Sequence, residues 1–337
     1  MRILFSITIV LLVHFACAQS FELKNITTNV NSSFRGMSVV DNLVAWVSGS
    51  HGWIGLSTDG GKTWTFTQVK GFENADFRSL YAFDDQRAII ANAGAPANIL
   101  VTSDGGKSWE VVYTNTHEAA FFDGIDFWND QDGLIYGDPI QGQMLLLKTN
   151  DGGNHWESLP NAPFLKSGEA SFAASGTGIR CIGKNKAMIV TGGVASRLWT
   201  TEDRGNTWTS ITPPILQGEP TTGIYSFSIL DSSIVLVGGD YTRPNLTTQH
   251  HLYSTDSGAS WKTPNQPSRG YRECVEFLDR ITVIATGPTG TDISTDGGKT
   301  WSSLSDETGY HVLRKARNGA VALIAGSKGT ISIILEK

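Results

Sequence analysis

The sequence predicts an all-β fold, namely a seven-bladed β-propeller built from four-stranded antiparallel blades. One octet with the skeleton Ser/Thr-x-Asp-x-Gly-x-x-Trp occurs six times, and successive copies lie 40 to 53 residues apart. Between the octets, segments of strand length rich in Val, Ile and aromatic residues alternate with short turns of Gly, Asn, Asp and Pro. A period of about 40 to 50 residues with four strands per copy is typical of propeller blades.

The first 18 residues have the composition of a signal peptide. Met1 and Arg2 precede an apolar run over residues 3–15, and Ala16-Cys17-Ala18 provides the small residues that signal peptidase accepts. We expect cleavage after Ala18 and a secreted or periplasmic protein, with residues 19–337 forming a single propeller domain. The apolar run is shorter than the roughly 20 residues that a membrane-spanning helix needs, so no membrane span is expected in the mature chain.

Each octet is expected to form the turn between the third and fourth strands of a blade. The aspartate can accept hydrogen bonds from backbone amides of its own turn, glycine adopts positive φ, and tryptophan begins the next strand as an apolar anchor. We therefore interpret the six octet aspartates as structural: Asp59, Asp104, Asp151, Asp203, Asp256 and Asp296.

Seven first strands accompany only six octets. They begin at Phe34, Phe77, Phe122, Ile179, Ile224, Tyr271 and Tyr310. The seventh unit has three strand-like segments but no octet and no fourth strand. Residues 21–27 precede the first unit and have no other partner, so we expect them to join the last blade as its outer strand and to close the ring.

Charge and cysteine content disfavour several classes of function. Without residues 1–18 the chain has 25 basic and 32 acidic residues, which disfavours binding to nucleic acid or to anionic membranes. Two cysteines remain, Cys181 and Cys274, too few for a disulfide scaffold. The sequence contains no Gly-rich dinucleotide fingerprint, no Cys-x-x-Cys and no cluster of metal ligands. We therefore expect neither a cofactor nor a metal.

The longest connections predict which face of the propeller binds a partner. The octets lie on the face that carries the turns after strands one and three, here called the octet face. The connections over residues 160–177 and 241–249 lie on the opposite, long-loop face. Because binding sites usually lie on long loops of a rigid scaffold, we expect the binding site on the long-loop face.

A second pattern emerges where the seven first strands are aligned at their starts. The residue after each leading apolar position is polar or aromatic: Arg35, Arg78, Asp123, Arg180, Tyr225, Arg272 and His311. We expect these positions at one height around the channel mouth, where the arginines would repel one another by roughly 1 kcal/mol per close pair in water. An anionic ligand would offset this repulsion, with Tyr225, Asp123 and Glu169 orienting the ligand or neutralising charge. The alternative is an internal salt-bridge ring made with Asp123, Glu118, Glu169 or Glu273.

The octet resembles the Asp-box, or bacterial neuraminidase repeat. Three further stretches resemble photosystem II stability/assembly factor propellers and their non-photosynthetic bacterial relatives: residues 136–139 (Tyr-Gly-Asp-Pro), 168–177 (Gly-Glu-Ala-Ser-Phe-Ala-Ala-Ser-Gly-Thr) and 238–241 (Gly-Gly-Asp-Tyr). These relatives are seven-bladed and exported, and the bacterial ones are often labelled oxidoreductase, a label that no residue of this chain supports. The resemblance implies a non-catalytic binding or assembly role, with a protein partner or an acidic small molecule or glycan as the ligand.

A glycosidase is the alternative from a different class, because Asp-box propellers include sialidases. Sialidases use three arginines and a tyrosine nucleophile. Arginines and Tyr225 are present in this chain, but it has Arg35-Gly36-Met37 in place of the Arg-Ile-Pro of sialidases, which also have six blades. A hydrolase with two carboxylates could use Asp123, Asp138, Glu169 or Asp240. Carboxylates paired with arginines would instead favour a scaffold role.

Overall fold

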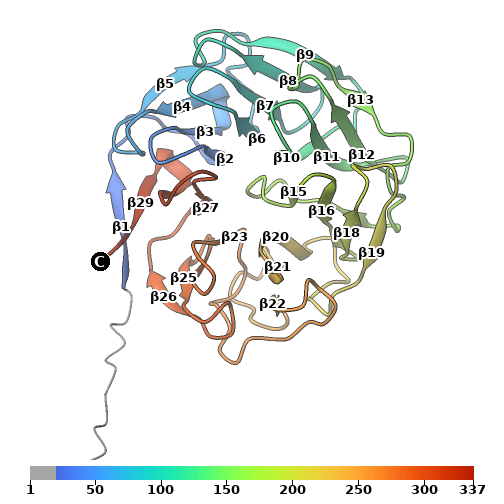
Figure 1. Cartoon of the computed structure of the whole chain (residues 1–337), viewed down its shortest axis with the longest axis vertical. Coiled ribbons are helices and arrows are strands. Elements are labelled where there is room, and N and C mark those ends of the chain that lie inside the picture. The colour runs from blue at the N-terminus through green and yellow to red at the C-terminus, as the bar shows by residue number, and fades with distance from the viewer. Residues whose placement is uncertain (1–19) are drawn as a thin grey trace, which may run out of the picture.

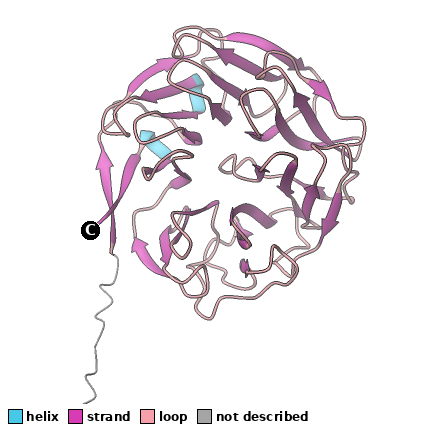
Figure 2. Cartoon of the chain, viewed as in Figure 1, coloured by secondary structure: helices cyan, strands magenta, loops and turns pink. Residues whose placement is uncertain are grey.

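The computed structural model describes residues 20–337, so the predicted signal peptide lies outside the described residues. Seven antiparallel sheets are arranged in a ring around a common axis (Figure 1). Figure 2 shows strands and loops almost throughout; the helices in the described part are two short 3₁₀ turns, η1 (Ser50–Gly52) and η2 (Ser327–Gly329). The structure confirms the predicted all-β, seven-bladed propeller.

The first three blades each contain four strands, in sequence order from the axis outward. Blade 1 contains β2 (Phe34–Val39), β3 (Ala45–Gly49), β4 (Trp53–Ser57) and β5 (Thr65–Gln68). Blade 2 contains β6 (Phe77–Ala82), β7 (Ala88–Asn92), β8 (Ala97–Thr102) and β9 (Glu110–Asn115). Blade 3 contains β10 (Phe122–Phe127), β11 (Gly133–Ile140), β12 (Gln143–Thr149) and β13 (Glu157–Ser158).

Blades 4, 6 and 7 also have four strands. Blade 4 contains β15 (Ile179–Ile182), β16 (Lys186–Val190), β18 (Leu198–Thr201) and β19 (Thr209–Ile211). Blade 6 contains β23 (Cys274–Phe277), β24 (Val283–Gly287), β25 (Gly290–Ser294) and β26 (Ser302–Ser305). Blade 7 contains β27 (Tyr310–Lys315), β28 (Ala322–Gly326) and β29 (Ile331–Glu336), and its fourth strand is β1 (Phe21–Ile26).

Blade 5 departs from the four-strand pattern. It contains β20 (Thr222–Leu230), β21 (Ser233–Asp240) and β22 (His251–Ser254), and no strand of this sheet follows its octet. The residues after that octet include Pro264 and Pro267, which lack the backbone N–H that a sheet requires. On the β20 side the sheet instead gains two short strands, β17 (Gly192–Gly193) and β14 (Glu169–Ala170).

The ring is closed by strands from the two ends of the described chain. β1 pairs antiparallel with β29, with Phe21 opposite Glu336 and Ile26 opposite Ile331. Figure 1 shows the blue β1 alongside the red β29. This is the pairing that the incomplete seventh unit predicts, and it covers the edge that β29 would otherwise expose.

The hydrophobic core is divided among the interfaces between adjacent blades. Trp46 of blade 1 packs with Phe77 and Ile90 of blade 2, and equivalent clusters fill the six other interfaces. A sheet that is packed on both faces needs apolar residues at successive positions rather than at alternate ones. This explains why every residue of β7 is buried.

The octets form tight turns on one face of the ring, as expected. Asp59 accepts hydrogen bonds from the Ser57 hydroxyl (2.9 Å) and from the backbone amide (2.9 Å) and hydroxyl (2.6 Å) of Thr63. All six aspartates accept the same two bonds, from the Ser/Thr two residues before and from the amide four residues after. The glycine two residues after each of these aspartates has a positive φ, 82° at Gly61.

Candidate functional site

Residues 160–177, here called the long loop, cross the axis of the ring at its long-loop face. The carbonyl of Ala174 accepts a hydrogen bond from Arg35 in blade 1 (2.8 Å), and that of Gly176 accepts one from Arg314 in blade 7 (3.3 Å). The Ser175 hydroxyl donates to the carbonyl of Glu273, at the start of blade 6 (2.8 Å). Residues 173–177 are buried, and Figure 1 shows the yellow-green chain reaching into the middle of the ring. The chain's own loop therefore covers this end of the channel.

Glu169 anchors the long loop from within the protein. Its carboxylate accepts hydrogen bonds from Nε of Arg197 (2.9 and 3.0 Å) and from the hydroxyl of Thr191 (2.6 Å), and its side chain is fully buried. Burial alone would raise the pKa of Glu169, but the bonds from Arg197 and Thr191 outweigh it and lower that pKa. Glu169 is thus an ionised structural anchor, and no arginine at the channel mouth pairs with it.

Five of the seven positions that the sequence aligned at the channel mouth are structurally equivalent. Each is the extra residue of a β-bulge in the first strand of its blade: Arg35, Arg78, Asp123, Tyr225 and His311. A β-bulge changes the direction in which a side chain points. These five residues therefore lie at equivalent positions of their blades, as the alignment of the first strands predicts.

The structure contradicts the expected height of Arg180 and Arg272. Cys181 pairs with a residue six positions later, Ala187, just as Phe127 pairs with Gly133 and Phe277 with Val283. Arg180 is therefore equivalent to Asp126 and Glu276, nearer the octet face. β15 lacks the bulge, and Thr177 occupies the position of Arg35. In blade 6 that position is held by Glu273.

Arg272 is enclosed within blade 6 rather than at the channel mouth. Its guanidinium binds Asp292 (Nε to Oδ2, 2.9 Å) and the hydroxyl of Thr289 (2.8 Å), and the side chain has no exposed surface. The salt bridge joins the start of β23 to β25. Arg272 is therefore inaccessible to a ligand in this conformation.

Arg35, Arg78 and His311 at the long-loop mouth each contact a carboxylate. Glu273 lies 3.2 Å from Arg35 and 2.6 Å from His311, while Arg78 binds Asp76 at 2.7 Å. This arrangement corresponds to the internal salt-bridge network that the sequence left open, with Glu273 in the role of the neutralising carboxylate.

The other predicted site residues at this end differ in their partners. Asp240 binds Arg243 at 2.6 Å and Tyr225 stacks on Phe172 of the long loop at 3.8 Å between ring centroids. Asp138 accepts a hydrogen bond from the amide of Ser171 (3.0 Å). Asp123 is fully buried and its carboxylate has no hydrogen-bond partner. Burial raises the pKa of Asp123 well above its ordinary value, and the neighbouring charge of Asp138 raises it further.

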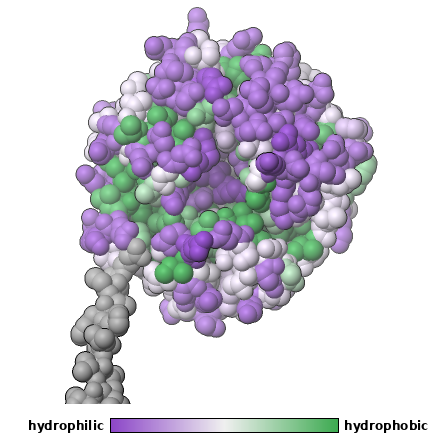
Figure 3. All heavy atoms as spheres, viewed as in Figure 1, coloured by the Kyte–Doolittle hydropathy of each residue, from purple (hydrophilic) through white to green (hydrophobic). Residues whose placement is uncertain are grey.

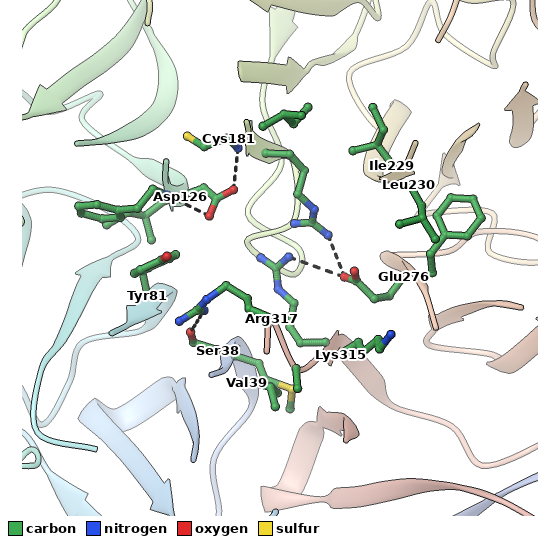
Figure 4. Close-up of a pocket in the computed structure, with 18 of the residues that line it drawn as sticks. Ser38, Val39, Tyr81, Asp126, Cys181, Ile229, Leu230, Glu276, Lys315 and Arg317 are labelled. Carbon is green, nitrogen blue, oxygen red and sulfur yellow. Dashed lines mark hydrogen bonds and ion pairs between the residues drawn. The ribbon is translucent and has the colours of Figure 1, made fainter. Parts of the chain in front are cut away.

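A cavity of about 610 Å³ lies at the octet-face end of the channel (Figure 4). All seven first strands contribute to its wall, and the rim includes residues of the first turns such as Gly183, Asp231 and Arg317. Figure 3 shows a hollow at the centre of the ring with hydrophilic residues at depth. We call this space the central cavity. Through it, a partner can approach the axis of the propeller from the octet face.

The central cavity is locally basic although the chain is acidic. Four cationic side chains and three carboxylates line it: Arg180, Arg314, Lys315, Arg317, Asp126, Asp231 and Glu276. The single carboxylate of Glu276 is shared by Arg180 (2.9 Å) and Arg314 (3.8 Å), and all three side chains are less than 20% exposed. Burial and the charge of Arg180 lower the pKa of Arg314 to about 10. Two guanidinium groups thus face one anion in a partly desolvated place.

The remaining charged groups of the central cavity tie blades together. Lys315 donates to the carbonyl of Leu278 (2.6 Å), and Arg317 donates to the hydroxyl of Ser38 (2.8 Å) and lies over the ring of Tyr81. Asp126 accepts from the amide of Cys181 (2.7 Å). Arg180 and Arg314 are therefore the cations best placed to bind an incoming anion.

Sequence reasoning missed Arg314 and Glu276. Glu276, like Asp126 and Arg180, pairs with the residue eight positions later in the second strand, and Arg314 pairs with the residue nine positions later. Aligning the blades at the turns that follow the first strands, rather than at the strand starts, reveals these four ionisable residues in one layer. Their pairing, however, depends on how the blades are arranged around the axis.

Two features are absent from the part of the chain that the structure describes. Residues 20–337 contain no group of three or more His, Cys, Asp or Glu side chains arranged to hold a metal ion. No helix within that range is long and apolar enough to cross a membrane.

Comparison with known proteins shows the family. The family model for photosynthesis system II assembly factor YCF48 matches residues 16–117 and 93–215, and the BNR/Asp-box repeat model matches residues 292–303. Among curated proteins, none matches this sequence.

Solved structures share the fold at low sequence identity. A structure of YCF48 bound to a D1 peptide is 17% identical, with a TM-score of 0.69, and the match covers 94% of this chain and 96% of that one. YCF48 from Cyanidioschyzon merolae is 16% identical, with a TM-score of 0.67 and coverages of 93% and 98%. A GH74 xyloglucanase from Xanthomonas campestris is 14% identical, with a TM-score of 0.66, and the match covers 93% of this chain but 53% of that one.

The two matches to the YCF48 model together span residues 16–215, more than half of the 337-residue chain. The chain therefore belongs to the YCF48 family of photosystem II assembly factors.

Proposed function

We propose that this chain is an exported, non-catalytic binding protein whose central cavity receives an acidic segment of a protein partner. The observation that carries the proposal is the sharing of one carboxylate, Glu276, by Arg180 and Arg314 at the wall of an open cavity. An incoming carboxylate can form charge-assisted hydrogen bonds with both guanidinium groups and relieve their mutual repulsion.

The family supports a protein partner. One YCF48 structure contains a D1 peptide. The long-loop face, where the sequence placed the site, is a weaker candidate because residues 173–177 cover the channel there and Arg35 already pairs with Glu273. Arg180 is the member of the predicted arginine set that the proposal retains.

Binding of acidic peptides by the mature chain tests the proposal. A fluorescently labelled peptide rich in Asp and Glu is titrated with protein and followed by anisotropy, and a peptide with Asn and Gln at those positions serves as the neutral control. Loss of a charge-assisted hydrogen bond costs about 1.5–3 kcal/mol, so Arg180→Met and Arg314→Met should each weaken binding roughly 10- to 100-fold. Binding should also weaken as salt is added.

Two matched variants locate the site. Arg87→Met removes an arginine of the octet face that is already paired with Asp84, and it should leave the affinity unchanged. Arg35→Met removes an arginine of the long-loop mouth. If only Arg35→Met weakens binding, the site lies on the long-loop face and the central cavity is not the binding site.

Two further measurements test the rest of the proposal. Residues 1–18 support export, and the secreted protein should begin at Gln19 when its N-terminus is determined by mass spectrometry. The GH74 relative keeps a glycosidase as the alternative. Release of reducing ends from xyloglucan, abolished by Asp138→Asn, would overturn the non-catalytic assignment.

A further inference from the structure

The turns after the first strands place one equivalent residue of each octet-bearing blade on the octet face. Its backbone carbonyl accepts a hydrogen bond of 2.8–3.0 Å from the amide that directly follows the octet aspartate. From blade 1 to blade 6 these residues are Leu43, Gln86, Gln131, Asn185, Ser232 and Ile281. Four of them are polar. Leu43 and Ile281 are apolar, and yet they are 58% and 54% exposed.

The octets of the same two blades also carry an exposed cation. The residue three positions after the octet aspartate is lysine in blades 1, 2 and 6, namely Lys62, Lys107 and Lys299. In blades 3, 4 and 5 it is Asn154, Asn206 and Ala259. The three lysines are exposed, and within residues 20–337 their ammonium groups form no hydrogen bond or ion pair. An exposed apolar turn residue and an unpaired lysine therefore occur together in blades 1 and 6 alone among the octet-bearing blades.

Blades 1 and 6 are the two neighbours of blade 7, as Figure 1 shows. The amide of Arg317, in the first turn of blade 7, donates to the carbonyl of Val39 in blade 1 (3.1 Å), and the Lys315 ammonium donates to the carbonyl of Leu278 in blade 6 (2.6 Å). Blade 7 carries this turn and the paired ends of β1 and β29 in place of an octet. The two lysine-bearing octets thus lie on either side of a blade that has no octet of its own.

This surface, here called the blade 7 ledge, is continuous with the central cavity. It comprises Leu43, Lys62, Ile281, Lys299 and Arg317. Arg317 lines the central cavity, as do Val39 and Leu278, which lie four and three residues before Leu43 and Ile281. A chain that leaves the central cavity over blade 7 therefore passes between two apolar side chains and two lysines.

The acidic residues of the same turns do not neutralise these lysines. The Asp41 carboxylate accepts hydrogen bonds from the amides of Leu43 and Val44 (both 2.8 Å). Asp279 accepts the equivalent bonds in blade 6, from the amides of Ile281 (2.8 Å) and Thr282 (2.7 Å). Both carboxylates are thus held within their own turns, and Lys62 and Lys299 remain available to an anionic group from outside.

We propose that the partner of the central cavity leaves it across the blade 7 ledge, as an extended segment that carries both apolar and acidic residues. Its apolar side chains contact Leu43 and Ile281, and its carboxylates face Lys62 and Lys299. This inference rests on the proposed binding of an acidic segment in the central cavity, and it adds a direction and a requirement for apolar residues. Single exposed apolar residues are common on soluble proteins, but here each accompanies an unpaired lysine, and both pairs flank the same blade.

Two labelled peptides test the inference by anisotropy with the mature chain. One contains an acidic core alone, and the other has Leu and Ile added on both sides of that core. Burying apolar side chains on the ledge should make the extended peptide bind roughly 10-fold more tightly. Leu43→Gln and Ile281→Gln should each weaken the extended peptide roughly 3- to 10-fold and leave the acidic core peptide unchanged.

Variants of lysine and matched controls complete the test. Lys62→Gln and Lys299→Gln should each weaken the extended peptide roughly 2- to 5-fold, and less at high salt. Lys184→Gln removes an exposed lysine from the first turn of blade 4, and Ile211→Gln removes an apolar residue, 45% exposed, from its outer strand. Both controls should bind the extended peptide normally. All six side chains are exposed, so the unfolding midpoint should be unchanged in each variant.

The outcomes separate this inference from the proposed function. If Arg180→Met weakens both peptides but the extended peptide binds no more tightly than the core, the ledge is not used and the cavity site stands. If neither Arg180→Met nor Arg314→Met weakens either peptide, the proposed function fails and the inference fails with it. The acidic net charge of the chain disfavours an anionic membrane as the occupant. Binding to phosphatidylglycerol vesicles that Lys62→Gln weakens, with peptide binding unaffected, would instead assign the ledge to a lipid surface.

Discussion

Replacing Glu169 by alanine should loosen the long loop and destabilise the protein. The Glu169 side chain is fully buried and that of Arg197 is 11% exposed, so the substitution leaves a guanidinium without its carboxylate in a mostly dry place. Breaking a buried ion pair in this way typically costs about 3–5 kcal/mol. Arg197 also lies 4.1 Å from the Trp199 ring centroid, a contact that the substitution preserves, so we expect the lower end, about 3 kcal/mol.

Thermal unfolding and limited proteolysis measure these two effects. For a chain of this size, about 3 kcal/mol corresponds to a fall of roughly 3–6 °C in the unfolding midpoint. Cleavage should become faster within residues 160–177, because the loop loses its bonds to Arg197 and Thr191. Glu219→Ala is the matched control, since it removes an exposed partner of Arg243 and should cost less than about 1 kcal/mol. The anchor role would be refuted if Glu169→Ala lowered the unfolding midpoint no more than Glu219→Ala does and left the rate of cleavage unchanged.

Three further predictions concern closure of the ring, acid stability and thiol reactivity. Removing residues 20–27 deletes β1 and exposes the edge of β29, so light scattering should show a larger mass than for the intact chain; an unchanged mass would contradict the closure argument. Hydrogen bonds from the Thr63 side chain and amide lower the pKa of Asp59 from 3.8 to about 2. Stability from this turn is therefore present above about pH 4 and lost as the pH falls toward 2, and thermal scans that are flat between these values would be inconsistent with it. Burial raises the pKa of the Cys181 thiol well above its ordinary value, so iodoacetamide at neutral pH should label it slowly until the protein unfolds, as followed by mass spectrometry; rapid labelling of the folded protein would disprove this.

The repetitive part of the fold could be predicted because the same local sequence pattern specifies each blade. The octets, the turn residues and the apolar strands define a blade without reference to other parts of the chain, and the surplus of first strands over octets predicts the pairing of β1 with β29. The missing outer strand of blade 5 was not predicted, although Pro264 and Pro267 in that segment signal it.

The candidate site was predicted less well, because its residues depend on register and on packing across the axis. Aligning first strands by their leading apolar residue gives the correct height only where a β-bulge adds one residue, and β15 and β23 lack it. Arg180 and Arg314 share Glu276, and these contacts join blades 4, 6 and 7. No pattern within a single blade's sequence predicts contacts between these three blades.

The length of the long loop was interpreted as a sign of binding, whereas the structure shows it packed over the channel. Residues 173–176 read Ala-Ala-Ser-Gly and are all buried. Small side chains of this kind allow close approach of the backbone to other elements, which is the more direct interpretation of that segment. The sequence predicts that Glu169 orients a ligand or neutralises charge at the channel mouth, whereas its bonds to Arg197 and Thr191 hold this loop in place.

A crystal structure of the mature chain with a short acidic peptide tests the central claim most directly. We predict electron density in the central cavity, with a peptide carboxylate between Arg180 and Arg314 and with Glu276 displaced from at least one of them. Density over Arg35 and Arg78 at the long-loop mouth, with the pair between Arg180 and Glu276 intact, would contradict the account and return the binding site to the opposite face.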